Sequence, residues 1–427
     1  MDTLPRSAVG YVAGNRPTVR SRWPAVAIVA VGMSLAVIVA ADGTLLSRLS
    51  KLVFIVALTI GTSALWLRPG RAGPWAALSL GTAGLVAGVG IGLRWLSVDG
   101  ISLIAVSGLV ALLASLPLVA AGIARLTYHL GAVMRLGVTI VMGVAVAVLV
   151  WTLSPALIAT SMPPIAHGAA TPADFGLDAE EVRFRTADDV DLWAWFIPPT
   201  EGATVVLRHG SGSTASSVLP QAEVLAGHGF GVLVPDARGH GFSGGQAMDF
   251  GWNGEMDIMA AVDFLVSRPE VDSEAIAVVG MSMGGEEAIG ATATNPLIRA
   301  VVAEGATGRT AEDAAWLSDE FGARGTLQEQ IEWLQDRVTD VLTSASVPAS
   351  LRAAAETSQA RYLMITAGDV LDEGHAAAYV TAGAPGRAEI WTVPGAGHTD
   401  GLSTAPAEWE QRVVSFLNGA LRPGLVR

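Results

Sequence analysis

The sequence predicts a bundle of about five membrane-spanning helices followed by a mostly parallel α/β domain. Two observations over the 427 residues lead to this fold class. Residues 1–160 carry 11 Lys and Arg against 3 Asp and Glu, whereas residues 161–427 carry 15 against 36. Long apolar stretches fill the first segment, and short β-branched runs alternate with helical patterns in the second. Two such compositions on one chain indicate two different environments.

Composition excludes several classes of protein. Hydrophobic residues make up 51% of the chain and charged residues 15%, against about 25% charged residues in an ordinary soluble domain. A disordered chain and a wholly soluble globule are therefore excluded. The acidic second half argues against nucleic-acid binding, which needs a basic surface. The chain has no cysteine, which excludes disulfides, thiolate metal sites and a cysteine nucleophile.

The membrane domain, residues 1–160, contains five apolar stretches separated by basic residues. A helix needs about 20 residues, and at least about 17, to cross the hydrocarbon core. Four stretches are long enough, and the second has 16 residues, although Lys51 and Arg68 at its ends could reach the membrane surfaces. Regularly spaced glycines in the third stretch could allow close helix contact. The stretches are residues 24–46, 52–67, 73–93, 101–123 and 136–158, and the glycines are Gly81, Gly84, Gly88 and Gly92.

Basic residues in the loops predict the orientation of this domain. With the N-terminus in the cytoplasm, eight basic residues lie on the cytoplasmic side and three outside, as the positive-inside rule prefers. Five crossings then leave the C-terminal half outside. We therefore expect a multi-pass protein of the cell membrane with an extracytoplasmic C-terminal domain. If one helix were miscounted, above all the short second one, the C-terminal domain would lie in the cytoplasm instead.

The second half is predicted to be a linker, residues 161–177, and an α/β domain, residues 178–427. The linker contains Pro163, Pro164 and Pro172, with serine, threonine and glycine among them. The first two strands are near neighbours, as in an antiparallel hairpin, and the others imply a mostly parallel sheet covered on both faces. Strands are expected at residues 181–185, 192–197, 204–208, 231–235, 275–279, 300–303, 362–366 and 389–393, and helices around 217–227, 255–267, 283–294, 374–382 and 409–421.

The fifth predicted strand runs into a G-x-S-x-G motif, and a helical pattern follows it. The motif reads Gly280-Met281-Ser282-Met283-Gly284. The serine must lie on a sharp turn that raises its Oγ above the sheet, and glycine on either side avoids collisions there. The helix behind Ser282 places the positive end of its dipole beneath developing negative charge. These residues predict a nucleophile at Ser282.

With this motif, residues of about 178–421 resemble the α/β-hydrolase superfamily, in particular its serine esterases and acyl hydrolases. The resemblance does not extend to the membrane domain, to which this half is fused. It implies the α/β-hydrolase fold, with eight strands and the nucleophile after the fifth. It also implies the chain order Ser, acid, His for the catalytic residues.

The predicted general base is His398. Of the seven histidines, His375 and His398 follow Ser282 in the chain, and His375 falls in a predicted helix. His398 lies in the loop Pro394-Gly395-Ala396-Gly397-His398 after the last strand, where the superfamily places its histidine. We expect His398 to take the proton from the Ser282 hydroxyl.

The resemblance places the carboxylate that orients His398 after the seventh strand. The family often has this acid three positions after a glycine, and that position here is Leu371. The next residue, Asp372, is therefore our choice. Asp369, Glu373 and Glu304 remain alternatives, and each of these carboxylates could instead be a solvated loop residue or a helix cap.

An oxyanion hole needs two backbone N–H donors. Met283 is expected to supply one, because it follows the nucleophile. The second is expected from the loop after the third strand, with Ser211 the first candidate and Gly210 the next. That loop, Arg208-His209-Gly210-Ser211-Gly212-Ser213, resembles the HG-x-x loop of the family.

Two further segments bear on the function. Residues 236–243 resemble a structural loop of the family, and no H-x-x-x-H or H-E-x-x-H spacing indicates a metal site. Residues 305–360 form a long insertion between strands six and seven, which we expect to pack as a helix on the domain or to act as a cap over an acyl pocket. Apolar residues repeat along it at helical spacing, namely Leu327, Ile331, Leu334, Val338 and Val341.

The sequence thus predicts a membrane-anchored serine hydrolase that cleaves an ester or related acyl bond with a Ser282, His398 and Asp372 triad. No cofactor and no metal is expected, and the substrate is a small-molecule or lipid acyl compound. Two alternatives are an acyltransferase that uses the same triad and a non-enzymatic membrane scaffold with a hydrolase-like domain. A degenerate scaffold would be expected to lose triad positions.

Overall fold

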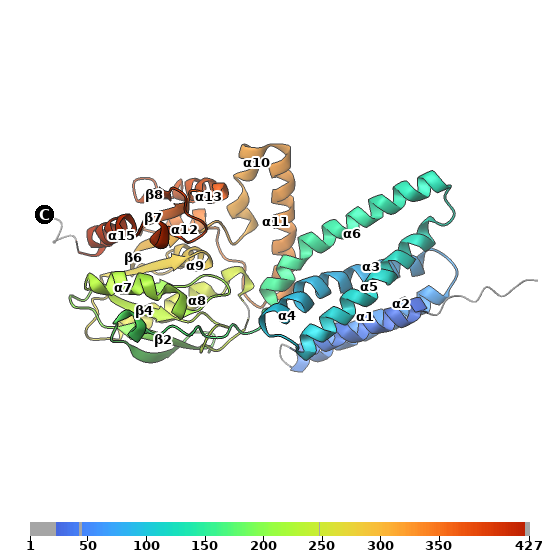
Figure 1. Cartoon of the computed structure of the whole chain (residues 1–427), viewed down its shortest axis with the longest axis horizontal. Coiled ribbons are helices and arrows are strands. Elements are labelled where there is room, and N and C mark those ends of the chain that lie inside the picture. Colours follow the sequence, from blue (N-terminus) through green and yellow to red (C-terminus); the bar gives the residue numbers. More distant parts are fainter. Residues whose placement is uncertain (1–22, 42–44, 247, 423–427) are drawn as a thin grey trace, which may run out of the picture.

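The computed structural model describes residues 23–41, 45–246 and 248–422. A helical bundle and an α/β domain lie one after the other along the long axis of the molecule (Figure 1). The N-terminal basic residues used to predict the orientation, Arg6, Arg16, Arg20 and Arg22, lie outside the described residues.

The bundle contains five helices that are long and apolar enough to cross a membrane. The third is continuous across a π-helical segment, so that α3, η1 and α4 together span Ala72–Val98. The second is 23 residues long rather than 16, because it begins before Arg48 and Lys51 instead of after them. The elements are α1 (Trp23–Ala40), α2 (Leu45–Leu67), α3 (Ala72–Ala87), η1 (Gly88–Leu93), α4 (Arg94–Val98), α5 (Leu103–Thr127) and α6 (Ala132–Thr160).

Glycines on one face of α3 and η1 let this helix pack closely on α5. A Cβ on Gly81 would lie 2.8 Å from the Val119 side chain, and a Cβ on Gly92 would lie 2.6 Å from the carbonyl carbon of Gly108. Gly84 and Gly88 contact Ser115 and Leu112 of α5 in the same way. The regular glycine spacing therefore marks a helix–helix interface, where small residues allow the backbones to approach.

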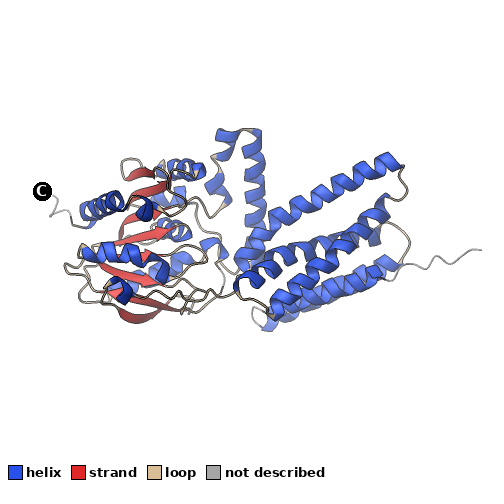
Figure 2. Ribbon diagram, in the orientation of Figure 1, coloured by secondary structure: helices blue, strands red, loops and turns tan. Residues whose placement is uncertain are grey.

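The α/β domain is built on one eight-stranded sheet with the order β1-β2-β4-β3-β5-β6-β7-β8 (Figure 2). β1 pairs with β2 and β2 with β4 in antiparallel register, and all other pairs are parallel. The predicted fold class is confirmed. The strands are β1 (Glu180–Arg185), β2 (Asp191–Ile197), β3 (Thr204–Arg208), β4 (Gly231–Pro235), β5 (Ile276–Met281), β6 (Ile298–Glu304), β7 (Arg361–Ala367) and β8 (Ala388–Val393).

Helices cover both faces of the sheet and bury a separate apolar cluster on each. α7 (Leu219–Gly227) and α15 (Pro406–Leu421) pack on one face, where Trp409 is fully buried. α8 (Gly254–Val266), α9 (Met283–Ala291), α12 (Leu351–Thr357) and α13 (Leu371–Thr381) cover the other. Because both faces are covered, the middle of each central strand is apolar, as in other buried parallel sheets.

The predicted linker is folded onto the domain. Ile165 pairs with His240 as an isolated bridge, and His167 Nδ1 lies 2.9 Å from the Asp236 carboxylate. The short helix η2 (Pro172–Phe175) follows and has a capping box formed by Thr171 and Asp174. Hydrogen bonds from this segment therefore connect the end of α6 to the loop after β4.

The insertion after β6, residues 305–360, forms four helical segments. The first three are η5 (Ala311–Ala314), α10 (Leu317–Phe321) and α11 (Ala323–Leu342), and the fourth is α12, which packs on the sheet. α11 packs on the α/β-proximal end of α6 (Figure 1). The predicted apolar stripe is half-buried at its centre, at Ile331, Leu334 and Val338, but Leu327 and Val341 are exposed.

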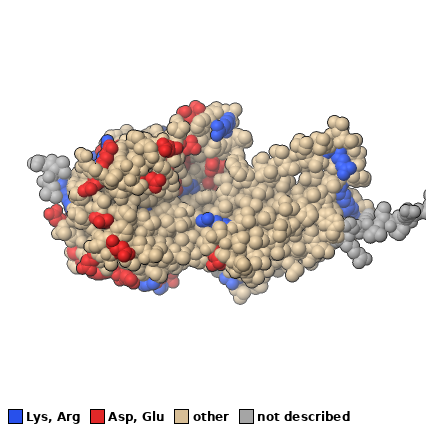
Figure 3. Space-filling model, in the orientation of Figure 1, with Lys and Arg blue, Asp and Glu red and all other residues tan. Residues whose placement is uncertain are grey.

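Charge separates the two parts of the molecule. On the face that Figure 3 shows, Asp and Glu side chains are spread over the α/β domain, whereas the middle of the bundle has almost no charged side chains. Large apolar side chains such as Phe54, Ile60 and Val141 are exposed on that surface. An apolar exterior on five long helices is the arrangement expected of a membrane bundle.

The α3–α5 interface can be tested with Gly108→Val. A Cβ on Gly108 would lie 2.3 Å from the Gly92 Cα, so we expect the bundle to lose about 1–3 kcal/mol of stability through overpacking. The measurement is the thermal midpoint of the detergent-solubilised protein. Gly137→Val on α6 is the control, because a Cβ there meets nothing within 4 Å. Equal midpoints for the two variants would contradict this interface.

Candidate active site

Ser282 lies on a strained turn between β5 and α9. Its backbone angles are φ 52° and ψ −124°, a conformation that costs a non-glycine residue of order 1–3 kcal/mol and often marks functional sites. Its N–H donates to the carbonyl of Glu304 at the end of β6, at 2.7 Å. The serine is thereby held above the carboxyl edge of the sheet.

The two glycines of the motif are required by contacts that a side chain would prevent. A Cβ on Gly280 would lie 2.3 Å from the carbonyl oxygen of Gly284. A Cβ on Gly284 would lie 2.6 Å from the carbonyl oxygen of His209. Glycine at both positions lets α9 start directly behind Ser282 and lets the loop after β3 pass beside it.

His398 meets Ser282 from the loop that follows β8. Its Nε2 lies 2.9 Å from Ser282 Oγ, which is hydrogen-bond distance. The two residues are 116 positions apart in the chain, and the sheet brings them together because both follow carboxyl ends of parallel strands. The structure thus places the sequence-predicted serine and histidine in direct contact.

The carboxylate that faces His398 is Glu373 rather than the expected Asp372. Glu373 Oε1 lies 2.6 Å from His398 Nδ1, and its Oε2 accepts a hydrogen bond from the N–H of Ala367 at 2.7 Å. The Glu373 side chain is buried. Asp372 is exposed and lines a cleft beneath the insertion.

The other two candidate carboxylates have different positions. Asp369 is exposed in the turn after β7. Glu304 is buried, and its two oxygens accept hydrogen bonds from the N–H of Gly401 at 2.7 Å and from Trp409 Nε1 at 2.9 Å. Glu304 therefore supports the loop that carries His398 and does not orient the imidazole itself.

The register of α13 explains why Glu373, and not Asp372, faces His398. The helix begins at Leu371, so that consecutive residues point in different directions. Glu373 lies three, four and seven positions before Ala376, Ala377 and Val380, which are buried with it. This apolar pattern in the sequence was the signal that puts Glu373 on the inward face.

Contact with Glu373 changes the acid–base behaviour of the histidine. The hydrogen bond that His398 donates to Glu373 raises the pKa of His398 above the ordinary 6.5, and the charge of Glu373 adds to this effect, whereas partial burial opposes it. The paired carboxylate favours the imidazolium form that a base must adopt after it has taken a proton.

Two backbone N–H groups are available beside Ser282. Within the described part of the chain, no group accepts a hydrogen bond from the N–H of Ser211 or Met283. Gly210 lies next to the nucleophile, because a Cβ on it would be 3.2 Å from Ser282 Cβ. The loop after β3 is therefore close enough to supply a donor from Ser211, as the sequence analysis expects, with Gly210 as the alternative.

The arrangement suits acyl transfer. A hydroxyl, an imidazole and a carboxylate are hydrogen-bonded in series, and the Met283 N–H lies at the start of a helix beside the hydroxyl. Among the described residues, no three His, Asp or Glu side chains are grouped so that they could hold a metal ion.

Part of the α/β domain is similar in sequence to known proteins. The family described as serine aminopeptidase, S33, matches residues 199–363. The thiohydrolase aneE of Aspergillus aculeatus is 35% identical over 127 residues, which are 29% of this chain and 40% of that protein. Protein bem46 of Schizosaccharomyces pombe is 29% identical over 130 residues, which are 29% of this chain and 43% of that protein.

Among solved structures, the esterase Pf2001 of Pyrococcus furiosus is similar, with 26% identity and a TM-score of 0.49. The similarity covers 61% of this chain and 98% of the esterase chain. The chain spans about two fifths of the length of the curated relatives it matches. The family match falls on the strands and helices that carry Ser282. The C-terminal half of the chain has the α/β-hydrolase fold.

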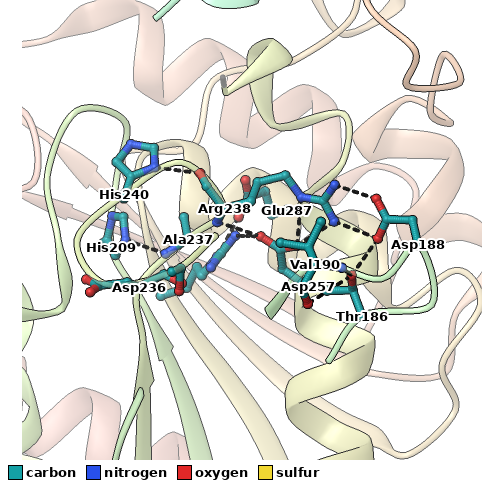
Figure 4. Close-up of polar contacts among 12 residues, drawn as sticks. Thr186, Asp188, Val190, His209, Asp236, Ala237, Arg238, His240, Asp257 and Glu287 are labelled. Atoms are coloured by element: carbon teal, nitrogen blue, oxygen red, sulfur yellow. Dashed lines mark hydrogen bonds and ion pairs between the residues drawn. The ribbon is translucent and has the colours of Figure 1, made fainter. Parts of the chain in front are cut away.

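A cluster of buried ions supports the active-site loops of the hydrolase domain (Figure 4). Arg208, at the end of β3, is 1% exposed; its Nε donates to Glu287 at 2.7 Å and its Nη2 to Asp257 at 2.9 Å. Asp257 also pairs with Arg238 at 2.7 Å, and Arg238 reaches Asp188 at 2.7 Å. These pairs tie α8, α9 and the loops after β3, β4 and β1 together.

Two histidines beside this cluster are held neutral. His209 Nε2 accepts from the N–H of Ala237 at 2.9 Å, and His240 Nε2 accepts from the N–H of Gly212 at 3.3 Å. Burial lowers the pKa of both imidazoles, and for His209 the neighbouring His240 lowers it further. They connect the loops after β3 and β4, and the expected structural role of residues 236–243 agrees with these contacts.

The insertion covers a cleft beside the catalytic edge of the hydrolase domain. The cleft has a volume of about 370 Å³, and its walls come from the loop after β6, from α10 and α11, and from the start of α13. Phe250 and Trp316 provide apolar wall, and Glu332 and Asp336 of α11 line the same cleft. Burial raises the pKa of both carboxyls, that of Asp336 to about 6.

The buried ion cluster predicts a large stability difference between two arginine variants. Arg208→Met leaves the Glu287 carboxylate buried without its partner, which should cost about 3–5 kcal/mol of unfolding free energy. Arg299→Met is the control, because its pair with Glu274 is solvent-exposed and should contribute less than about 1 kcal/mol. Urea unfolding followed by tryptophan fluorescence measures both, and equal losses would contradict the assigned role of Arg208.

Proposed function

We propose that this protein is a membrane-anchored serine hydrolase that cleaves an ester or related acyl bond with a Ser282–His398–Glu373 triad. The observation that carries the proposal is the unbroken series of contacts from hydroxyl to imidazole to buried carboxylate, at 2.9 and 2.6 Å. Each element of the series has a separate cause in the fold, namely the turn after β5, the loop after β8 and the inward face of α13.

In the proposed reaction, Ser282 Oγ attacks the acyl carbonyl carbon while His398 Nε2 takes its proton. The carbonyl oxygen becomes an anion, which the N–H groups of Met283 and Ser211 stabilise. His398 then gives the proton to the departing alcohol or thiol, which leaves an acyl-serine. A water molecule, deprotonated by His398, attacks the acyl-serine, and collapse returns the carboxylic acid and free Ser282.

Glu373 orients the imidazole and stabilises its protonated form. The carboxylate holds the proton on Nδ1, so that Nε2 can accept from Ser282. Burial of Glu373 and its second hydrogen bond, from the N–H of Ala367, fix the direction of the carboxylate. A glutamate here fills the role in which the sequence analysis placed an aspartate.

An acyl substrate is supported by the chemistry of the site and by one relative. An activated serine with an oxyanion hole serves esters and thioesters well, and the printed name of the Aspergillus relative is that of a thiohydrolase. The five candidate membrane helices make a lipid acyl substrate a natural choice beside a small-molecule one.

The nucleophile can be tested by labelling with a fluorophosphonate probe. We expect wild-type protein in membranes to be labelled, Ser282→Ala to lose labelling completely and His398→Ala to lose about 10³-fold or more in labelling rate. Ser267→Ala is the matched control, because Ser267 is exposed at the end of α8. A folded wild type that is not labelled would contradict the hydrolase proposal and favour the scaffold alternative.

Two neighbouring carboxylates give a sharper test of the triad. Glu373→Gln removes the charge beside His398, and the labelling rate should fall about 10³- to 10⁴-fold. Asp372→Asn, one residue away and exposed, should change the rate little. If Asp372→Asn had the larger effect, Glu373 would not be the orienting acid.

The pH profile of the same reaction reports on His398. The base must be neutral, so labelling should fall as the pH drops through the pKa of His398, with a midpoint above 6.5 because Glu373 raises that pKa. In Glu373→Gln the midpoint should move down. Burial raises the pKa of Glu286 to about 7, so this carboxyl titrates in the same pH range as His398. Glu286→Gln is therefore the control, and its labelling midpoint should stay close to that of the wild type.

We further propose that the hydrolase domain lies outside the cytoplasm. The positive-inside rule and five crossings support this orientation. External protease added to intact spheroplasts should therefore digest the C-terminal half, with a cytoplasmic protein as the control for sealed cells. Protection of the hydrolase domain in sealed cells, with digestion after lysis, would reverse the orientation.

A further inference from the structure

We propose that Arg94, a residue of the helical bundle, forms an anion-binding subsite at the entrance to the active site. Together with the apolar cavity beside it, Arg94 would bind the charged head and the first part of the chain of a single-chain anionic amphiphile. This inference rests on the proposed hydrolase function and names the class of substrate that the site would select, an acyl amphiphile with a phosphate or carboxylate group.

The catalytic edge of the hydrolase domain faces the bundle. The loop after β3 reaches Arg94 of α4. The short helix η4 (Asp249–Gly251), after β4, packs against α6, and α11, after β6, packs against α6 as well. Ser282 follows β5 at this same edge of the parallel sheet. A substrate must therefore reach Ser282 through surroundings that the membrane-spanning helices help to form.

Arg94 carries a charge without an acidic partner. Its Nε donates to Met162 Sδ at 3.2 Å, and within the described residues no carboxylate forms an ion pair with it. The side chain is half-buried. A thioether is a weak acceptor, so the terminal nitrogens of the guanidinium remain available to bind an anion in a bidentate manner.

The guanidinium lies close to the loop that borders the nucleophile. Arg94 Nη2 is 3.6 Å from the position that a Cβ would take on Gly212. Gly210, two residues earlier, is in contact distance of Ser282. Ser211, the expected oxyanion donor, lies between them. A group bound to Arg94 would therefore lie at the rim of the acyl site rather than elsewhere on the surface.

An apolar cavity opens next to Arg94, between the end of the bundle and the hydrolase domain. Trp95, the next residue in the chain, lines it, and Trp95 Nε1 donates to the carbonyl of Ser161 at 2.6 Å. Met162, the partner of Arg94, lines it too. The remaining apolar walls come from the ends of α1, η1 and α5, at Ile38, Ala41, Ile91 and Ile104.

A cation beside an apolar cavity complements a ligand with both features. An anionic head would pair with the guanidinium, and methylene groups would be removed from water by the isoleucines and Trp95. A soluble anion would use Arg94 alone, and a neutral lipid would use the cavity alone. The juxtaposition of the two therefore favours an anionic amphiphile from the bilayer.

The test measures protection of Ser282 from fluorophosphonate labelling in full-length protein in nanodiscs of neutral lipid. Three competitors are compared: dodecyl phosphate, dodecanol and inorganic phosphate. Dodecyl phosphate should protect wild type, and Arg94→Gln should require about 10- to 100-fold more of it, as expected for the loss of charge-assisted hydrogen bonds. Arg94→Lys keeps the positive charge but loses the planar guanidinium that binds an anion through two hydrogen bonds. The concentration of dodecyl phosphate that protects it should therefore lie between those for wild type and Arg94→Gln.

Controls separate this effect from damage to the fold. Rates are normalised to those of each variant without competitor, and thermal midpoints show that the variants are folded. Arg135 lies in the first turn of α6, and Figure 1 shows that this end of α6 is the one far from the α/β domain. Arg135→Gln should therefore behave as wild type. Dodecanol should protect Arg94→Gln and wild type equally, because it carries no charge.

Four outcomes would overturn the inference. Equal protection of wild type and Arg94→Gln by dodecyl phosphate would remove Arg94 from the site. Arg94-dependent protection by inorganic phosphate at the same concentration would assign the subsite to a soluble anion instead of an amphiphile. Absence of labelling in wild type without any competitor would contradict the proposed hydrolase function itself. Labelling of wild type that none of the three competitors slows would leave that function intact and overturn the Arg94 subsite alone.

Discussion

The positive φ at Ser282 is the constraint on which the rest of the catalytic edge depends. A serine adopts this conformation only when the surrounding structure enforces it. Here β5 leads into the turn, α9 starts immediately behind it, and Gly284 lets the chain after β3 pass within contact distance. The same geometry that strains the backbone also leaves the Met283 N–H without a hydrogen-bond acceptor among the residues that the structure describes.

The buried ion pairs around Arg208 hold the elements on both sides of this strained turn in place. Desolvated charges are costly unless each has a partner, and Arg208 meets Glu287 of α9 and Asp257 of α8 with full burial of all three side chains. The cluster therefore couples the helix behind the nucleophile to the end of β3, whose next residues carry the expected oxyanion donor. Its function is structural, but it fixes the positions on which the proposed chemistry relies.

The bundle packs directly against the α/β domain. α6 packs on α11 and on η4, and the folded segment after α6 contacts Asp236 through His167. These contacts set the catalytic edge against one end of the bundle. An anchor alone would need none of them, whereas an enzyme that takes its substrate from the bilayer would need an entrance at this junction.

The sequence by itself determined the fold class and the five apolar helices, because periodicity and the order of helices and strands are local or sequential properties. Its resemblance to the α/β-hydrolase superfamily, carried by the G-x-S-x-G motif, predicted the pairing of Ser282 with His398. The sequence did not select Glu373 over Asp372. Adjacent residues of a helix point in different directions, and the residue at which α13 begins decides that Glu373 points inward. The sequence also carried no sign that Arg94 lies near Gly212. Residues 118 positions apart meet there because tertiary packing places α4 beside the loop after β3, and no local pattern encodes such a distant contact.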